Sequence, residues 1–272
     1  MRSWMDQAAD QFRQTSALIA QLDDQGFTPF FTAPTHDAEV RRDHTQAIIE
    51  RLAAWSPHAI EFPLRVYSTG PVFEHGTWAE SLDVEVLEER SGDSDRIIFD
   101  LLTHLIAERF GPPANQNLVF VAGHLGLLRG LFSARQWSKE AIESVERAIG
   151  QGQYNQVEEK IKSKSPELLP LFRPSPPETM IGHLNTLTRG VSPSEVTPML
   201  LSLPREVDHV PAVLWDLSLT GSFAYYSGLV FALYARGQGE ALIKGGRFFL
   251  RYQDRNWQGT GFTIALPEWF RS

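Results

Sequence analysis

The spacing of apolar residues along this 272-residue chain changes between a helical period and a strand period. Near the N-terminus, apolar residues recur at helical spacing, at Ala8, Phe12, Ile19 and Leu22. Gly26 follows as a stop signal, so we expect an amphipathic helix over about the first 25 residues. The sequence FTPFF at 27–31 then predicts a short strand.

Two later segments have the apolar face and the end signals of helices. HTQAIIERLAAW, at 44–55, follows Asp43 in the position of an N-cap and ends before Pro57. DSDRIIFDLLTHLIAERF, at 93–110, precedes a Gly-Pro-Pro sequence, and we expect Ser94 to cap this helix.

Strand-like patterns occur before and after a central region that reads as all-helical. They are LRVYSTG (64–70), SLDVEVLEE (81–89), LVFVAGH (118–124), AVLWDLSL (212–219), GLVFALYA (228–235), EALIK (240–244), RFFLRY (247–252) and GTGFTIAL (259–266). Between them we expect a helical insertion at about 134–210, with its prolines in loops. This order predicts an α+β fold, an antiparallel sheet flanked by helices, in a single domain spanning 1–272.

Composition narrows the class of protein. A hydrophobic content of 42% is enough for a full core. No stretch approaches the roughly 20 apolar residues of a membrane span, and the N-terminus lacks the apolar run of a signal peptide, so we expect a soluble, cytoplasmic protein. Cysteine is absent and the formal charge is -8, which disfavours thiolate metal sites and binding to nucleic acid.

Common catalytic and cofactor motifs are missing. GQGEAL at 237–242 lacks the third glycine of a dinucleotide loop and precedes a strand. There is no Walker A sequence, no HExxH pair and no GxSxG elbow. We therefore expect no cofactor, no metal site and no covalent catalysis, and we expect His124 to be a structural residue at a strand-to-helix turn.

A set of weaker motifs occurs in a specific order along nearly the whole chain. They are VRRDHT (40–45), GPVF (70–73), AGHLGLLRGLF (122–132), AYYSGLVFALY (224–234), GGRF (245–248) and GFTIAL (261–266). Their order and spacing resemble the class II histidyl-tRNA synthetase core. Within that superfamily the chain is most similar to the regulatory subunits of ATP phosphoribosyltransferase, in histidine biosynthesis.

Charged positions depart from the synthetase pattern. Glu74 stands where the resemblance implies a phosphate-binding arginine, Gly221 and Ala224 replace an arginine and an aspartate, and Glu268 replaces a second ATP-binding arginine. Because charged anchors contribute strongly at phosphate sites, we expect adenylation to be lost. The chain also ends where the anticodon-binding domain of the synthetase would begin, so we expect no such domain.

The same resemblance implies a histidine pocket, for which the candidates are Asp43, Thr45, Tyr225, Tyr226, Gly245 and Gly246. Each has a structural alternative. Asp43 and Thr45 could serve simply to start a helix. The two glycines could serve simply as a two-residue hairpin turn. Adjacent residues of an extended strand point to opposite faces, so we expect one of the two tyrosines to line the pocket and the other to pack in the core.

These resemblances imply a non-catalytic regulatory subunit. It would bind the short-form catalytic subunit of ATP phosphoribosyltransferase, be required for that subunit's activity, transmit feedback inhibition by L-histidine and self-associate. One alternative is a class II synthetase paralogue that activates an amino acid for an acceptor other than tRNA. Another is a synthetase-like interaction protein without a histidine response.

Overall fold

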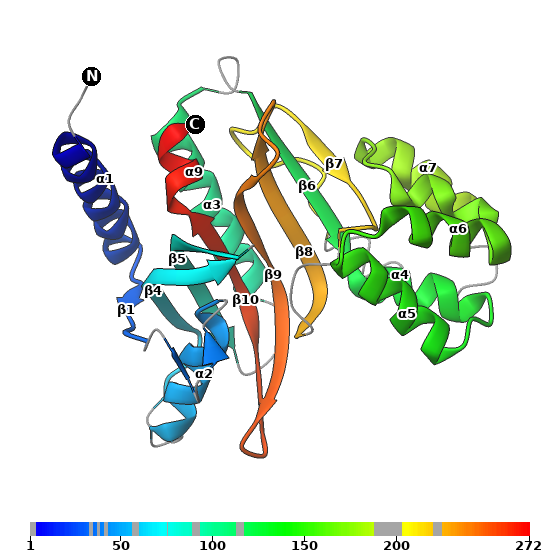
Figure 1. Ribbon diagram of the computed structural model, residues 1–272, viewed down its shortest axis with the longest axis horizontal. Coiled ribbons are helices and arrows are strands. Elements are labelled where there is room, and N and C mark those ends of the chain that lie inside the picture. Colours follow the sequence, from blue (N-terminus) through cyan, green and yellow to red (C-terminus); the bar gives the residue numbers. More distant parts are fainter. Residues whose placement is uncertain are drawn as a thin grey trace.

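The computed structural model describes residues 4–32, 35–36, 39–40, 43–55, 60–74, 76–88, 93–112, 117–187, 203–219 and 225–272. Its strands are β1 (Thr28–Pro29), β2 (Thr35–His36), β3 (Glu39–Val40), β4 (Leu64–Glu74), β5 (Thr77–Glu88), β6 (Leu118–His124), β7 (Val213–Trp215), β8 (Tyr226–Ala235), β9 (Ala241–Tyr252) and β10 (Arg255–Ala265). Eight of them form one sheet in the order β1-β4-β5-β10-β9-β8-β6-β7, and β2 and β3 pair separately (Figure 1).

The sheet is antiparallel in its interior and parallel at both edges. From β4 to β6, every neighbouring pair is antiparallel. The edge strands β1 and β7 run parallel to β4 and β6. Parallel neighbours need a long crossover, and here one crossover contains a helix and the other contains the helical insertion. The predicted α+β class is confirmed, with a sheet that is mixed because of these two crossovers.

Strand β9 is longer than the sequence pattern indicated. EALIK and RFFLRY belong to one continuous strand, so the predicted hairpin turn at Gly245 and Gly246 is wrong. The turn lies instead between β9 and β10, at Gln253 and Asp254, whose φ angles are 48° and 57°. Two successive positive φ angles are typical of the tight turn that matches strand twist.

Helices cover both faces of the sheet. They are α1 (Trp4–Asp24), α2 (Thr45–Ala54), α3 (Ser94–Phe110) and the short α9 (Leu266–Arg271). In β5, Leu82, Val84 and Val86 belong to the core cluster that includes α3, whereas Leu87 packs in the cluster that includes α2. Because strand side chains alternate, α2 and α3 lie on opposite faces.

The N-terminal helix ends as predicted but does not bury all of its predicted face. Gly26 has a φ of 77°, and the Phe27 N–H donates to the Leu22 carbonyl at 3.0 Å, which ends α1. Leu22 is fully buried, but Phe12 is 74% exposed. The helix extends beyond the edge of the sheet (Figure 1), so its apolar spacing continues where no neighbour covers it.

Helices make up most of the described part of the predicted insertion, whereas its residues 203–210 form bends and a turn. The insertion follows α4 (Leu125–Ala134) and contains α5 (Lys139–Gly150), α6 (Tyr154–Lys164), the 3-10 helix η3 (Pro166–Phe172) and α7 (Pro177–Leu187), gathered beyond the β6–β7 edge (Figure 1). Pro166 and Pro177 begin helices, so their predicted place in loops is wrong. Proline is tolerated there because the N–H groups of the first helical turn have no acceptor within the helix. The remainder, 188–202, lies outside the described residues.

Two helix starts differ by one residue from the prediction. The N-cap position of α2 is His44, although the Asp43 carboxylate still accepts the Gln46 N–H at 3.3 Å. Helix α3 begins at Ser94. Its first N–H groups are satisfied by Glu88, which accepts from Asp93 and Ser94 at 3.2 and 2.9 Å. A carboxylate from a neighbouring strand therefore replaces the expected cap.

The predicted structural role of His124 is confirmed. Its Nδ1 accepts the Leu127 N–H at 3.1 Å at the start of α4.

None of the described helices combines the length and apolar character that crossing a membrane requires.

Candidate ligand-binding site

Three central strands form the floor of a small pocket on the α2 side of the sheet. Glu85 of β5 is in register with Gly261 of β10, which is in register with Gly246 of β9. A Cβ at Gly261 would lie 1.8 Å from Glu85 Oε2, and one at Gly246 would lie 3.1 Å from the Tyr226 ring. Both glycines are therefore needed for these two side chains to lie over the sheet.

The pocket walls come from α2 and from the start of β8. Its lining consists of Thr45, Glu85, Tyr225, Tyr226, Gly246, Phe248, Gly261, Phe262 and Thr263. The volume open to the centre of a water molecule is about 10 Å³, which is room for about one water. A ligand as large as an amino acid would require these side chains to move.

Both tyrosines line this pocket, so the expectation that only one of them does so is wrong. Their ring centroids are 5.2 Å apart. Tyr225 precedes β8, and the pairing of β8 with β9 shifts register between Tyr226 and Val230. The alternation of a regular strand therefore does not apply at this position.

Hydroxyl groups contact the carboxylates around the pocket. The Thr45 hydroxyl donates to Glu85 Oε1, and the Tyr225 side chain hydrogen-bonds Asp43. Burial raises the pKa of Glu85 well above its usual range. Burial, and then the nearby charge of Asp83, raise the pKa of Asp43 to about 6. Burial also raises the pKa values of Tyr225 and Tyr226, which keeps both phenols neutral.

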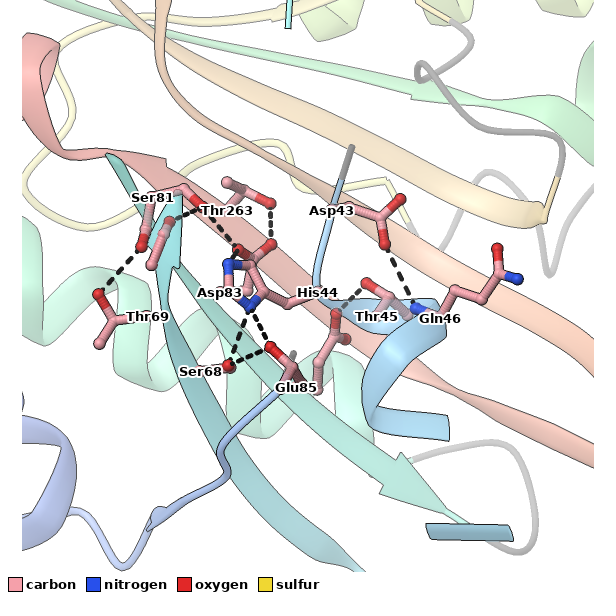
Figure 2. A network of polar contacts seen from close by, with 12 residues as sticks. Asp43, His44, Thr45, Gln46, Ser68, Thr69, Ser81, Asp83, Glu85 and Thr263 are labelled. Carbon is pink, nitrogen blue, oxygen red and sulfur yellow. Dashed lines mark hydrogen bonds and ion pairs between the residues drawn. The ribbon is translucent and has the colours of Figure 1, made fainter. Parts of the chain in front are cut away.

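A second polar cluster lies next to this pocket, between β4, β5 and the start of α2 (Figure 2). His44 is fully buried; its Nδ1 lies 2.9 Å from the hydroxyls of both Thr32 and Ser68, and its Nε2 lies 3.5 Å from Asp83 Oδ2. The Thr263 hydroxyl donates to the other Asp83 oxygen. Asp83 is therefore held by neighbours on two other elements, the start of α2 and β10.

The arrangement suits binding of a small polar ligand better than phosphate chemistry. The described lining contains one carboxylate and four hydroxyl-bearing residues, and it contains no lysine or arginine. Within the described ranges, no group of histidine and carboxylate side chains has the geometry of a metal site. The pocket therefore offers hydrogen-bond acceptors and hydroxyls to a ligand, with no described cation for a phosphate.

The structure brings most of the predicted site residues together. Thr45, Tyr225, Tyr226 and Gly246 line the pocket, and Asp43 is beside it. Gly245 does not line it: a Cβ there would meet Phe231 and Phe262, which belong to the core on the α3 side.

Sequence reasoning missed Glu85, Asp83, His44 and Gly261. Asp83 and Glu85 alternate with apolar residues in β5, which is the pattern of a strand with one face in water. That face is covered instead, and both carboxylates are at least 97% buried. Glu85 lies directly opposite Gly261 of GFTIAL on the neighbouring strand. This pairing could have pointed to the site, but it cannot be recognised until the pairing of β5 with β10 is known.

The structure describes only some of the positions at which this chain departs from the charged residues of the synthetase pattern. Gly221 and Ala224 lie outside the described residues, and for Glu74 only the backbone, at the end of β4, is described. Glu268 lies in α9, where its carboxylate pairs with Arg271.

Curated relatives match this chain at low identity. An ATP phosphoribosyltransferase regulatory subunit from Desulfitobacterium hafniense is 24% identical over 267 residues, covering 92% of this chain and 68% of that protein. One from Chromohalobacter salexigens is 29% identical over 157 residues, covering 53% of this chain. The aligned region spans only 40% of the length of that second protein.

Solved structures share the fold. Histidyl-tRNA synthetase from Nostoc sp. PCC 7120 superposes with a TM-score of 0.77 at 14% identity, over 97% of this chain and 71% of that one. A chain of the HisG:HisZ ATP phosphoribosyl transferase complex from Thermotoga maritima superposes with a TM-score of 0.63 at 17% identity, over 94% of this chain and 97% of that one. The sequence model of the histidyl-tRNA synthetase family matches residues 38–268, and the chain belongs to that family.

Proposed function

We propose that this chain is a non-catalytic regulatory subunit of ATP phosphoribosyltransferase, acting in histidine biosynthesis. In this role it binds the short-form catalytic subunit, is required for that subunit's activity and transmits feedback inhibition by histidine. The regulatory subunits among its relatives support the assignment, as does its superposition on a chain of the HisG:HisZ complex.

The observation that carries the proposal is that the described lining of the pocket has no cationic side chain to bind a phosphate. The pocket retains buried acidic and hydroxyl groups that suit an amino acid, yet its described lining has no lysine or arginine. Phosphoryl chemistry depends on cations that stabilise the charge developing in the transition state. A binding and coupling role therefore fits these residues better than adenylation.

Co-expression with a short-form catalytic subunit tests the assembly. We expect the two chains to co-elute on size-exclusion chromatography and the catalytic subunit to gain activity in the complex. Separate elution at micromolar concentration, together with full activity of the catalytic subunit alone, would remove the basis for the regulatory assignment.

Feedback requires that histidine bind two states of the complex unequally. If the pocket is the histidine site, Tyr225→Phe should weaken feedback, because the Tyr225 hydroxyl hydrogen-bonds Asp43. Losing a hydrogen bond in a buried site costs about 1 to 3 kcal/mol, or on the order of tenfold or more in affinity. Unchanged histidine inhibition in this variant would place the effector site elsewhere.

The alternative function is a synthetase paralogue that activates an amino acid for another acceptor, which the family match favours. It predicts histidine-dependent exchange of pyrophosphate into ATP. We expect no exchange above a control without enzyme. Exchange that is lost in a Glu85→Gln variant would support the alternative over the regulatory role.

A further inference from the structure

A larger cavity lies on the α3 side of the sheet, on the opposite face from the candidate ligand-binding site. It lies where α1, α3 and α9 meet, and its volume is about 150 Å³, against about 10 Å³ for that site. Its apolar floor is formed by Leu18, Leu105 and Trp269, which are all buried. These three side chains belong to the main core cluster, so the cavity opens directly onto the core.

The sequence of α1 explains why the three helices leave this space. The stripe of α1 that lines the cavity has the helical spacing i, i+3, i+4, i+7 and consists of Gln14, Ala17, Leu18 and Gln21. Leu18 is the one large apolar residue of this stripe, and the side chain of Ala17 ends at its Cβ. The two glutamines are two helical turns apart, or about 10 Å along the axis. The gap beside Ala17 therefore has an amide side chain at each end.

The wall formed by α3 and α9 is fixed by hydrogen bonds. The Arg109 guanidinium donates to three carbonyl oxygens at the end of the chain, those of Trp269, Phe270 and Ser272, at 3.3, 3.2 and 2.9 Å. Arg109 cannot turn into the cavity without losing these bonds. The cavity is therefore preformed, as sites for small molecules usually are.

The polar groups around the cavity favour a neutral ligand. The side-chain amides of Gln14 and Gln21 make no hydrogen bond to another described residue, and an amide can both donate and accept. The lining also contains one carboxylate, Glu108, and one guanidinium, Arg109, so an ion of either sign meets a like charge as well as an opposite one. An apolar floor with amides at its ends suits an aromatic ring that carries an amide.

We propose that the cavity between α1, α3 and α9 is a second ligand-binding site, which takes a neutral aromatic amide of about the size of benzamide. The ring packs on Leu18, Leu105 and Trp269, and the amide hydrogen-bonds Gln14 or Gln21. A cavity of about 150 Å³ has room for a benzene ring. The lining shares no residue with the candidate ligand-binding site, so this proposal does not depend on the proposed function.

Titration of the full chain with benzamide, followed by proton–nitrogen NMR correlation spectra, tests the proposal. We expect shift changes in the amides of α1, α3 and α9 and in the indole N–H of Trp269, with a Kd of about 1 mM or tighter for a ligand of this size. Benzoate and benzylamine have the same ring but carry a charge. Each should bind about tenfold more weakly or less, because an ion loses hydration on an apolar floor.

Ala17→Phe tests the location, and Ala20→Phe is the matched control. Both alanines are exposed residues of α1, so neither substitution alters the buried core, but only Ala17 lines the cavity. A phenyl ring at position 17 occupies the space of the ligand ring. We expect Ala17→Phe to weaken benzamide binding about tenfold or more and Ala20→Phe to leave it unchanged.

Three results would overturn the proposal. The first is the absence of shift changes up to the solubility limit of benzamide in the unaltered chain, which does not depend on how any variant folds. The second is equal binding of benzamide, benzoate and benzylamine, which would mean that the lining does not select a neutral amide. The third is unchanged affinity in Ala17→Phe, which would mean that benzamide binds elsewhere.

Discussion

Burial of the Asp43 carboxylate makes the stability of the fold depend on pH. Folding raises its pKa from 3.8 to about 6, chiefly through burial. The folded chain therefore binds this proton more tightly than the unfolded chain does. Stability contributed by this group is largest at low pH, falls as the pH rises from about 4 to about 6, and stays lower above that range.

Asp43→Asn removes this titration and keeps an oxygen that can accept the Gln46 N–H. We expect the variant to exceed the original chain in stability by up to about 3 kcal/mol near pH 7, and to match it near pH 4. Guanidinium unfolding across this pH range measures the difference. The exposed Asp208→Asn is the control, and a difference that does not depend on pH would contradict the raised pKa.

Gly261 is the residue that makes room for the Glu85 carboxylate. A Cβ there would lie 1.8 Å from Glu85 Oε2 and 2.6 Å from the Val84 carbonyl oxygen. We expect Gly261→Ala to lower the free energy of unfolding by about 1 to 3 kcal/mol and to weaken ligand binding, because Glu85 must move.

Gly130→Ala is the matched control for Gly261. Gly130 lies within α4, and beyond its two chain neighbours and the backbone of its own helix no atom lies within 4 Å of a Cβ built there. Alanine is favoured over glycine in helices by about 0.5 to 1 kcal/mol, so this variant should be as stable as the original chain or more so. If both substitutions have the same effect in urea unfolding, close packing at Gly261 is not the cause.

At the scale of elements, the β6–α4 junction depends on a histidine that must stay neutral. Burial lowers the His124 pKa from 6.5 to about 4, which keeps Nδ1 free of a proton and able to accept the Leu127 N–H. Here the unfolded chain binds the proton more tightly. The stability from this group is present above about pH 6.5 and is lost as the pH falls toward 4, the opposite sign to Asp43.

His124→Asn should keep the cap and lose the pH dependence, whereas His124→Ala should lose about 1 kcal/mol near pH 7 through the missing cap. Thermal unfolding followed by circular dichroism at several pH values distinguishes the two variants. If Asn and Ala destabilise the chain equally at neutral pH, the hydrogen bond to Leu127 does not stabilise the helix.

At the scale of the whole molecule, one core connects the sheet to the helical insertion. Leu168 and Met180 of the insertion belong to the same buried cluster as Trp215 and Phe231 of the sheet. Ser175 and Trp215 also exchange backbone hydrogen bonds of 3.0 and 2.8 Å. Elements that share a core tend to unfold together.

We therefore expect the most protected amides of α5, α6 and β8 to exchange with a common opening free energy in native-state hydrogen exchange. Val145→Ala, in the buried face of α5, should lower that value by about 1 to 3 kcal/mol in the sheet as well as in the insertion. Loss of protection confined to α5–α7 would instead mean that the insertion unfolds independently.

The sequence by itself determined the elements whose signals are local. The apolar run and the turn at His124 predicted β6 and α4, and the helical spacing and the Gly-Pro-Pro stop predicted α3, because periodicity and end signals act over a few residues. The motif order indicated the family, which the match over residues 38–268 confirms.

Only the tertiary structure decided how the pocket is built. Glu85, Gly261 and Gly246 are far apart in sequence, and strand register alone places them side by side. The same pairing makes β9 one strand across Gly245 and Gly246, and the register shift at Tyr226 lets both tyrosines line the pocket. Whether a polar strand face meets water or another element depends on non-local packing, and that packing is what buries the carboxylates of β5.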